Sequence, residues 1–434
     1  MTVLKLTNRH KRLLHQASRS IIEGYFVSFP SAFRSRKWLF KTNRYRYSCT
    51  SLYGKDTQPG ATSLNHRDLI AYISASAPTH VIDGWSYLGR AVDATLRGDA
   101  YAATHLGYYA ELRAAMGLLA SEGIGVFSDR HPVVDDHSRT NAFRGGGTHK
   151  VIWPILRYWA TLARAADLLD DLVMPNSIRL SAWLTETRTT IPVRAVAQHW
   201  LRSWGLDLAV VDDDHDCRNL ASYRPSEFRR PERLDVHEQT SFVEELWQLF
   251  EPGAARRFPN LESLLLRNAY RKRTGNAPSS SDLERLGLSP LESMGWVAFL
   301  QRTDDPSPLQ LAEEWVPVDD PTCHLRIISR AALLLFLASA AARRLLSNAA
   351  YSSDDILFWW GRHGEDRALW NIGPAPDDPK NLWADISQAI IDSAAWRAND
   401  PMRSASLREW RLSQSGALAD FGGFELVGVW ALMP

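Results

Sequence analysis

An arginine and a histidine flank three consecutive glycines in the segment Arg144-Gly145-Gly146-Gly147-Thr148-His149. The segment leads into a stretch with helical periodicity, and Thr148 is expected at the N-cap of that helix. A glycine loop at a helix N-terminus can bring backbone N–H groups close to an anion, Arg144 can hold a phosphate, and His149 can transfer a proton. The Lys-Ser/Thr pair that closes a P-loop is absent. A mobile surface loop before an ordinary helix cap would give the same residues, so both interpretations stay open.

A second arginine lies in the segment Arg218-Asn219-Leu220-Ala221-Ser222-Tyr223. This segment resembles the Arg-Asn-x-x-x-His signature of HEPN-domain ribonucleases, with Tyr223 at the position of the histidine. The resemblance implies a small helical bundle in which Arg218 and Asn219 act on RNA at a dimer interface. Tyr223 departs from the family pattern, because a phenol with a pKa of about 10 is a poor general base near neutral pH.

The Arg144–His149 segment has the same spacing as that signature, because four residues separate the arginine from the histidine. Its glycines differ from the helical spacing of the family. The two segments could therefore form an intact and a degenerate motif in one bundle. The alternative for either motif is structural, with the arginines satisfying buried carbonyl groups and Tyr223 capping a bundle.

Cations and aromatic rings alternate in a tract near the N-terminus. Residues 1–60 hold twelve Lys and Arg and two acidic residues, a net charge of +10, and the remainder of the chain carries −9. Single-stranded nucleic acid is bound by such a pattern, because cations contact phosphates and rings stack on bases. The alternatives are a half-buried strand pair with a basic polar face, or an arm that contacts the protein's own acidic surface. The predicted nucleic-acid contacts are Arg34, Arg36, Lys37, Trp38, Lys41, Arg44, Tyr45 and Arg46.

Neither a metal nor a cofactor is predicted. Residues 212–216 (Asp-Asp-Asp-His-Asp) hold types that can bind Mg²⁺, but consecutive residues cannot all face one ion, so a solvated acidic turn is expected. The three cysteines, Cys49, Cys217 and Cys323, are far apart and form no CxxC pair. This spacing argues against a disulfide scaffold and a thiolate zinc site, and it favours a reducing cytoplasm.

Helical periodicity dominates the chain and predicts a mainly α fold: multi-helix bundle domains with a small, irregular or β-containing N-terminal segment. Extended or loop structure is expected over 26–62, and a long loop over 123–147. The helix at 101–121 is expected to pack against one at 148–172, and residues 421–432 could form a strand. The main helices are expected at 8–25, 83–96, 101–121, 148–172, 322–348 and 380–397.

Three parts are expected along the chain: a basic N-terminal segment at 1–65, a helical domain with the arginine motifs at 66–273, and a Trp-rich helical domain at 283–434. The most apolar run, residues 331–342, is shorter than the roughly 20 residues that span a bilayer, so it predicts a buried helix. The N-terminus lacks the uninterrupted apolar core of a secretory signal. We therefore expect a cytoplasmic protein without a membrane partner.

The sequence favours an intracellular helical protein that engages RNA or single-stranded nucleic acid. The HEPN resemblance implies more, namely a ribonuclease of a bacterial defence or toxin system. The alternative is a non-catalytic interaction or scaffold protein that docks a protein partner, or a second copy of itself, through the Trp-rich C-terminal half. A metal-dependent hydrolase using residues 212–216 is the third hypothesis.

Overall fold

The computed structural model describes residues 5–61, 64–186, 192–201, 235–253, 258–273, 278–314, 320–370 and 375–434. Within these residues the secondary structure is almost entirely helical. The one sheet found there is an antiparallel hairpin of β1 (Arg130–Val134) and β2 (Thr140–Arg144). The predicted mainly α fold is confirmed. The division into parts at 1–65, 66–273 and 283–434 stays a prediction.

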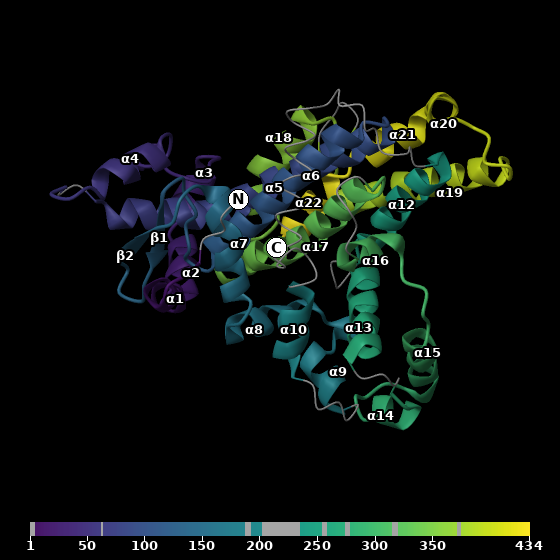
Figure 1. Cartoon of the computed structure of the whole chain (residues 1–434), viewed down its shortest axis with the longest axis horizontal. Helices are drawn as coiled ribbons and strands as arrows, with labels where there is room; N and C mark the ends of the chain where they lie inside the picture. Colours follow the sequence, from purple (N-terminus) through teal and green to yellow (C-terminus); the bar gives the residue numbers. More distant parts are fainter. Residues whose placement is uncertain are drawn as a thin grey trace.

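Three long helices, α5 (His66–Leu96), α6 (Ala100–Ser121) and α17 (Cys323–Asn348), pack against one another at the centre of the molecule (Figure 1). Among the described helices α17 alone is long and apolar enough to cross a membrane, but its whole apolar window is buried inside the fold. The predicted buried helix at 331–342 is therefore confirmed. The helix predicted at 83–96 begins much earlier, at His66, and includes the buried Pro78.

Two glycines allow α17 to lie close to its neighbours. A Cβ atom added to Gly84 of α5 would stand 2.5 Å from Cδ2 of Leu335, and one added to Gly107 of α6 would stand 2.9 Å from Cγ2 of Ile327. Real Cβ atoms do not approach other heavy atoms so closely. Both glycines are therefore packing requirements of the central bundle.

A buried ion pair links α6 to α17. Nε of Arg330 donates to Oε1 of Glu111 at 3.0 Å, and both side chains are at most 2% exposed. Burial raises the pKa of Glu111, and the charges of Arg330 and Arg326 oppose that rise. The attraction between the two charges offsets part of the free-energy cost of removing each of them from water.

The region predicted as one helix at 148–172 is divided into α7 (Thr148–Trp159) and α8 (Ala163–Leu172). Between them the hydroxyl of Thr161 donates to the carbonyl oxygen of Tyr158 at 2.7 Å, and Leu162 is extended with ψ of 153°. Such local side-chain bonds compete with the helical ladder. The helix α6 contacts α7, but its main partners are α5 and α17.

The segment in which a terminal strand was predicted forms α21 (Ser415–Gly422) and α22 (Leu426–Leu432) instead. Every residue of α22 is buried, against α5 and α17 among others. A fully buried helix shows no polar face, so its sequence lacks the period that separates helix from strand.

The other described helices surround this bundle, and some of them extend well away from it (Figure 1). One group, here the lower arm, contains η1 (Pro175–Ser177), α9 (Leu180–Glu186), α10 (Val193–Leu201), α13 (Pro259–Arg273), α14 (Ser280–Glu284) and α15 (Pro290–Leu300). The others are α12 (Val236–Leu249), α16 (Ser307–Glu313), η3 (Asp354–Ile356), α18 (Leu357–Asp366), η4 (Pro379–Leu382), α19 (Trp383–Ala398) and α20 (Leu407–Ser413).

We expect Glu111→Ala to lower the free energy of unfolding by about 3–5 kcal/mol, because it removes the carboxylate that pairs with the buried Arg330 in the core. Urea denaturation measures the change. The control is Asp366→Ala, which removes the exposed partner of Arg362 at the surface and is expected to cost no more than about 1 kcal/mol. Equal losses for the two variants would contradict the assigned role of the buried pair.

Candidate nucleic-acid interface

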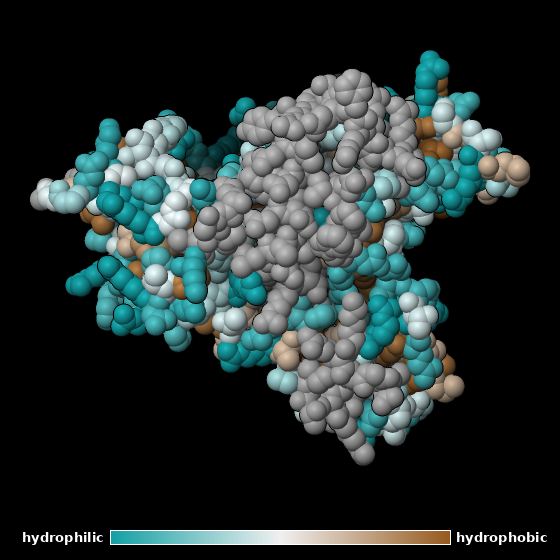
Figure 2. Space-filling model, in the orientation of Figure 1, coloured by the Kyte–Doolittle hydropathy of each residue, from teal (hydrophilic) through white to brown (hydrophobic). Residues whose placement is uncertain are grey.

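The N-terminal segment folds into four short helices at one end of the molecule (Figure 1). They are α1 (Asn8–His15), α2 (Arg19–Val27), α3 (Pro30–Arg34) and α4 (Cys49–Asp56). Together with the β1–β2 hairpin they form what we call the basic lobe. The extended structure predicted over 26–62 is therefore wrong for α3 and α4, and the long loop predicted over 123–147 contains the hairpin. Figure 2 shows mostly hydrophilic side chains over this end of the molecule.

The basic lobe is fixed to the bundle by apolar packing and by bonds to helix-end carbonyl groups. Ile22 and Phe26 of α2 are fully buried. The guanidinium group of Arg164 donates to the carbonyl oxygens of Leu14 and Ala17 at 3.0 and 2.6 Å. The hydroxyl of Tyr351 donates to the carbonyl oxygen of Phe26 at 2.7 Å. These bonds link backbone carbonyl groups at, or just beyond, the ends of α1 and α2 to side chains of the bundle.

Three cations of the predicted tract, Lys37, Lys41 and Arg46, lie close enough together to repel one another. The pKa of the half-buried Lys37 is lowered first by partial desolvation and then by the like charges of Lys41 and Arg46. In the described part of the chain, none of these three cations forms an ion pair with a carboxylate. Arg36 is exposed beside them, and Arg34 is the last residue of α3. The tract therefore presents concentrated positive charge at the surface.

Arg44 differs from the other cations of the tract. Its Nη2 donates to Oδ1 of the buried Asp56 at 2.7 Å, and its Nε donates to Oδ2 at 3.0 Å. The hydroxyl of Tyr45 donates to the same carboxylate at 2.7 Å. Arg44 thus helps to hold α4 against the turn before it, and its charge is neutralised within the lobe.

The rings of the tract divide into buried and exposed members. Tyr45 is fully buried, and Trp38 packs among Phe33, Phe358 and Trp359 with centroid distances of 5.4–6.0 Å. The buried Tyr45 ring offers no face to a base, so its predicted stacking role is wrong for this conformation. Trp38 is half-buried, and its role stays a prediction.

Two other rings of the same tract are exposed. Phe40 is 38% and Tyr47 is 82% exposed. The guanidinium of Arg46 lies 4.7 Å from the Tyr47 ring centroid, so a ring and a cation are already paired at this surface. The rings suited to stacking on bases are therefore Phe40 and Tyr47, which the sequence alone did not distinguish from their neighbours.

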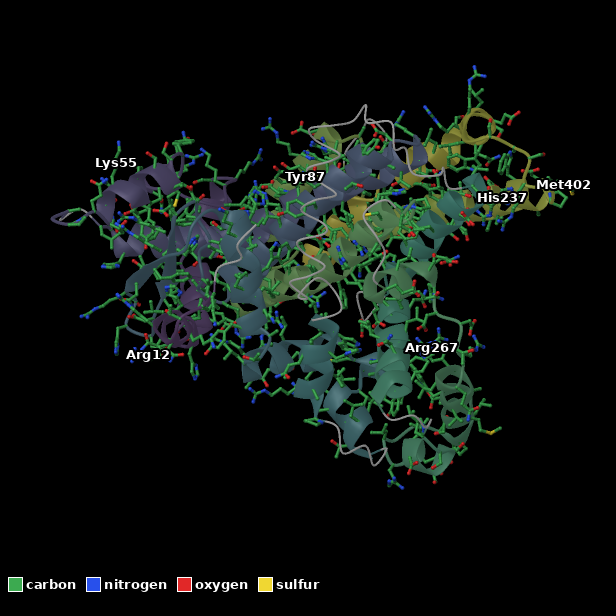
Figure 3. All side chains as sticks on the ribbon, in the orientation of Figure 1. Arg12, Lys55, Tyr87, His237, Arg267 and Met402 are labelled. Atoms are coloured by element: carbon green, nitrogen blue, oxygen red, sulfur yellow. The ribbon has the colours of Figure 1, made fainter. Side chains whose placement is uncertain are left out.

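A second set of exposed cations lies on α1. Arg9, Lys11 and Arg12 are exposed, and Figure 3 shows Arg12 on the opposite side of the lobe from Lys55. The rings of His10 and Phe143 approach to 4.9 Å between centroids, which places α1 beside the strand that ends at Arg144. The cations of α1 therefore belong to the side of the lobe that carries the end of β2.

The glycines after Arg144 form the turn between β2 and α7. Gly146 has φ of +84°, a conformation that favours glycine. Gly147 is the N-cap of α7, and the hydroxyl of Thr148 donates instead to the carbonyl oxygen of Phe127 at 3.2 Å. The predicted N-cap at Thr148 is therefore wrong, because that hydroxyl is engaged elsewhere. Arg144 itself is exposed at the end of β2.

His149 lies in the first turn of α7, against aromatic residues of α6. Its Nδ1 lies 2.9 Å from the hydroxyl of Tyr108, and the two rings are stacked with centroids 5.7 Å apart. Tyr109 meets the imidazole edge-on at 6.2 Å. These contacts fix the orientation of the ring. Local sequence patterns could not predict these contacts, because Tyr108 and His149 are 41 residues apart.

His131 lies beside the glycine turn and hydrogen-bonds to it. The backbone N–H of Phe127 donates to its Nδ1 at 3.2 Å, and its Nε2 lies 3.1 Å from the carbonyl oxygen of Gly146. These bonds specify a neutral imidazole with the proton on Nε2. Burial lowers the pKa of His131 to about 4, and the bond to Gly146 opposes the shift.

The HEPN-like residues Arg218, Asn219 and Tyr223 lie outside the described residues, and so do residues 212–216. The structure therefore does not relate them to Arg144 and His149. In the part of the chain that is described, no three His, Cys, Asp or Glu side chains gather in a way that could hold a metal ion.

Comparison with known proteins finds no matching family model, no similar curated protein and no similar solved structure. The resemblance to HEPN ribonucleases accordingly rests on its few residues alone.

We expect His131 to stay neutral well below pH 6.5. An unfolded chain binds this proton near pH 6.5, whereas the native protein binds it only near pH 4, so His131 destabilises the native state as the pH falls between these values. Nitrogen-detected NMR of the histidine rings should show the Nε2–H tautomer of His131 at pH 5. A protonated ring at that pH would contradict the assignment.

Proposed function

We propose that the protein binds single-stranded nucleic acid, and RNA in particular, through the basic lobe. The observation that carries the proposal is the surface formed by Lys37, Lys41 and Arg46 together with the exposed rings of Phe40 and Tyr47. Cations without carboxylate partners attract phosphates, and exposed rings offer stacking faces for bases. Duplexes do not offer such faces, because their bases are already stacked.

The charge distribution supports this proposal over an arm that contacts the protein's own acidic surface. Residues 1–60 carry +10 against −9 for the rest of the chain. Within the described residues Arg44 is the cation of the tract that pairs with a carboxylate, and that carboxylate, Asp56, belongs to the same lobe. The surrounding cations remain available to phosphate groups, and long-range steering would favour a polyanion at this end of the molecule.

We expect simultaneous substitution of Arg36, Lys37 and Lys41 by Ala to weaken binding of a single-stranded RNA and to flatten its salt dependence. Each lost phosphate contact on a single strand removes about 0.7 from the slope of log K against log salt. Three contacts therefore predict a decrease in slope of about 2, measured by fluorescence anisotropy at several salt concentrations.

The matched control removes three exposed arginines far from the lobe, Arg302, Arg403 and Arg408, and so changes the net charge equally. It should leave the slope nearly unchanged. Equal effects of the two triple variants, or a parent protein that binds no RNA, would refute the proposed interface and favour a protein-docking role for the lobe.

Phe40→Ala and Tyr47→Ala are expected to weaken RNA binding by about 1–3 kcal/mol each, because each removes one stacking face. Their salt slopes should equal that of the parent protein, since no cation is lost. Leu412→Ala, at a residue 68% exposed and outside the lobe, is the control for loss of exposed apolar surface. Unchanged affinity in both ring variants would show that bases do not stack there.

A second candidate function, RNA cleavage, is favoured by the contact that orients His149. Catalytic histidines are commonly held by a hydrogen bond to one ring nitrogen, as Tyr108 holds Nδ1 here at 2.9 Å. In the reaction proposed, the ribose 2′-oxygen attacks phosphorus and loses its proton to His149. The bond from phosphorus to the 5′-oxygen breaks, which leaves a 2′,3′-cyclic phosphate, and the 5′-oxygen takes a proton from water. Arg144 would stabilise the charge on the phosphate.

If this reaction occurs, His149→Ala should abolish cleavage while RNA affinity changes little. Tyr108→Phe keeps the stacked ring but loses the hydroxyl, and it should lower kcat more than it changes KM. Cleavage should persist in EDTA, because the reaction uses no metal. Full cleavage by His149→Ala would exclude this histidine as the proton acceptor, and the HEPN-like role in defence would lose its support with it.

A further inference from the structure

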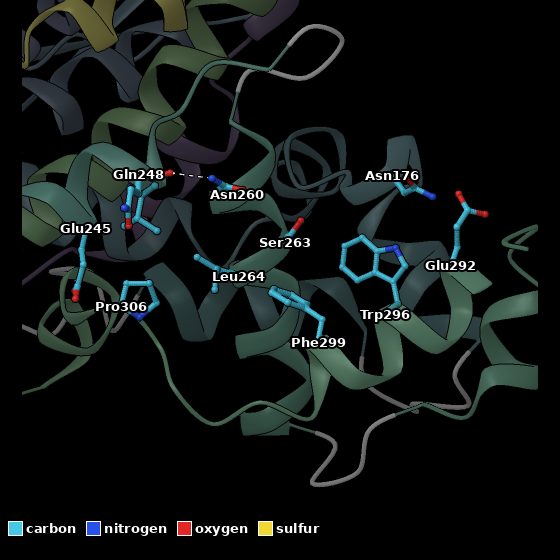
Figure 4. A pocket seen from close by; sticks show the side chains of 12 residues that line it. Asn176, Glu245, Gln248, Asn260, Ser263, Leu264, Glu292, Trp296, Phe299 and Pro306 are labelled. Atoms are coloured by element: carbon cyan, nitrogen blue, oxygen red, sulfur yellow. Dashed lines mark hydrogen bonds between the residues drawn. The ribbon is translucent and has the colours of Figure 1, made fainter. Parts of the chain in front are cut away.

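A cavity of about 490 Å³ lies in the lower arm between η1, α12, α13 and α15 (Figure 4). Leu264, Trp296 and Phe299 give it apolar walls, and the two rings are perpendicular with centroids 5.6 Å apart. No Lys or Arg is among the described residues that line it. This cavity therefore offers no cation to an anionic ligand.

A second cavity, of about 340 Å³, has the opposite electrostatic character. It lies between α8, α17 and the residue that precedes α9. Its described lining holds three arginines and one carboxylate, namely Arg179, Arg343, Arg344 and Asp171. The volume falls within the range of small-molecule sites. Because positive charge exceeds negative charge among these side chains, the cavity favours an anionic ligand.

Asp171 fixes two of these arginines next to each other. Nη1 of Arg344 donates to Oδ2 of Asp171 at 2.7 Å, and Nη2 of Arg179 lies 3.1 Å from Oδ1. Each guanidinium group thus meets a different oxygen of the same carboxylate. Since one negative charge is shared by two cations, a net positive charge remains beside the cavity.

The neighbouring carboxylate, Asp170, is engaged elsewhere. Nη1 of Arg179 is 3.9 Å from Oδ2 of Asp170, which is beyond hydrogen-bond distance. Asp170 accepts instead from the N–H and the hydroxyl of Ser181 at 2.6 and 2.9 Å, in the first turn of α9. It is not among the residues that line the cavity. Its bonds therefore hold the start of α9.

Both arginines keep N–H donors for a ligand. A guanidinium group carries five of them. Within the described residues Arg344 uses Nη1 for Asp171, and none of its other nitrogens is buried without a partner. The side chain of Arg179 is 61% exposed. Ser347, in the last turn of α17, lines the same cavity and adds an exposed hydroxyl.

The remaining side chains of the lining are apolar. Leu168 and Leu172 come from α8, and Ala340 comes from α17. The cavity therefore combines guanidinium donors with apolar surface. A ligand that matches both has an anionic group attached to an organic part.

We propose that this cavity binds a phosphate monoester group. Guanidinium groups bind phosphate oxygens through paired N–H donors. A monoester carries a charge of about −1.5 to −2 at neutral pH, which matches the excess of positive charge in the lining. An internal phosphodiester of RNA carries a single charge and is a poorer match. The inference does not depend on RNA binding by the basic lobe.

Isothermal titration calorimetry of the full chain with phenyl phosphate and methyl phenyl phosphate tests the proposal. The two molecules carry the same ring, but the second is a diester with one charge. Phenyl phosphate should bind, and the diester should bind at least tenfold more weakly. Simultaneous substitution of Arg36, Lys37 and Lys41 by Ala should leave the affinity for phenyl phosphate unchanged, because these cations belong to the basic lobe.

Two variants with matched controls locate the binding site. Arg344→Gln should weaken phenyl phosphate binding at least tenfold. Arg367→Gln should not, although Arg367 is equally exposed, at 31%, and also pairs with a carboxylate. Ser347→Glu adds a negative charge to the cavity and should abolish binding. Ser413→Glu adds the same charge at the exposed last residue of α20 and should leave binding unchanged.

Competition separates two sources of the phosphate group. Displacement of phenyl phosphate by a 5′-phosphorylated RNA, but not by its 5′-hydroxyl form, would assign the cavity to the end of a strand. Displacement by neither would assign it to a small phosphorylated molecule. Displacement by both would contradict the match to a doubly charged group.

Three further results would overturn the proposal. They are the absence of phenyl phosphate binding, equal affinities for the monoester and the diester, and binding that survives both Arg344→Gln and Ser347→Glu. The last would place the phosphate on the basic lobe or elsewhere on the surface. Circular dichroism of each variant shows whether it is folded, and Ser347→Glu serves as the decisive variant if Arg344→Gln is not.

Discussion

Burial of α17 between α5 and α6 is the constraint on which the rest of the structure depends. The helix can lie there because Gly84 and Gly107 carry no side chain, and because the buried charge of its Arg330 is neutralised by Glu111 across the interface. The same helix then serves as the support for distant parts of the chain, since α2, α8, α16 and α22 all pack on it. The two ends of the sequence are thereby joined in one core.

The geometry of the candidate site depends on contacts with this core. Tyr108, which orients His149, packs against Cys323 and Ile327 of α17. Tyr351, in the segment that follows α17, donates its hydroxyl to the carbonyl oxygen of Phe26 and so links that segment to the basic lobe. Trp38 packs against the aromatic residues of α18, whereas Phe40 and Tyr47 are exposed to solvent. Which rings face solvent is thus decided by tertiary packing.

The sequence predicted the features that local periodicity controls. The helix at 101–121 and the buried run at 331–342 agree with α6 and α17. The features that the sequence did not predict depend on contacts with residues farther along the chain. The hydroxyl of the buried Tyr45 bonds Asp56. The hairpin at 130–144 lies beside the start of α5, where Nδ1 of His66 is 2.8 Å from Oγ1 of Thr140. The cavity near Trp296 had no sequence signal, because its lining comes from residues more than 100 positions apart.

The central claim, that RNA contacts the exposed rings and cations of the basic lobe, is tested most directly by cross-linking. A thiouridine-containing single-stranded RNA is irradiated with the full chain, and cross-linked peptides are located by mass spectrometry. The account predicts cross-links within residues 36–47, centred on Phe40 and Tyr47. Cross-links confined to other parts of the molecule, with the peptide that carries residues 36–47 recovered unmodified, would contradict it.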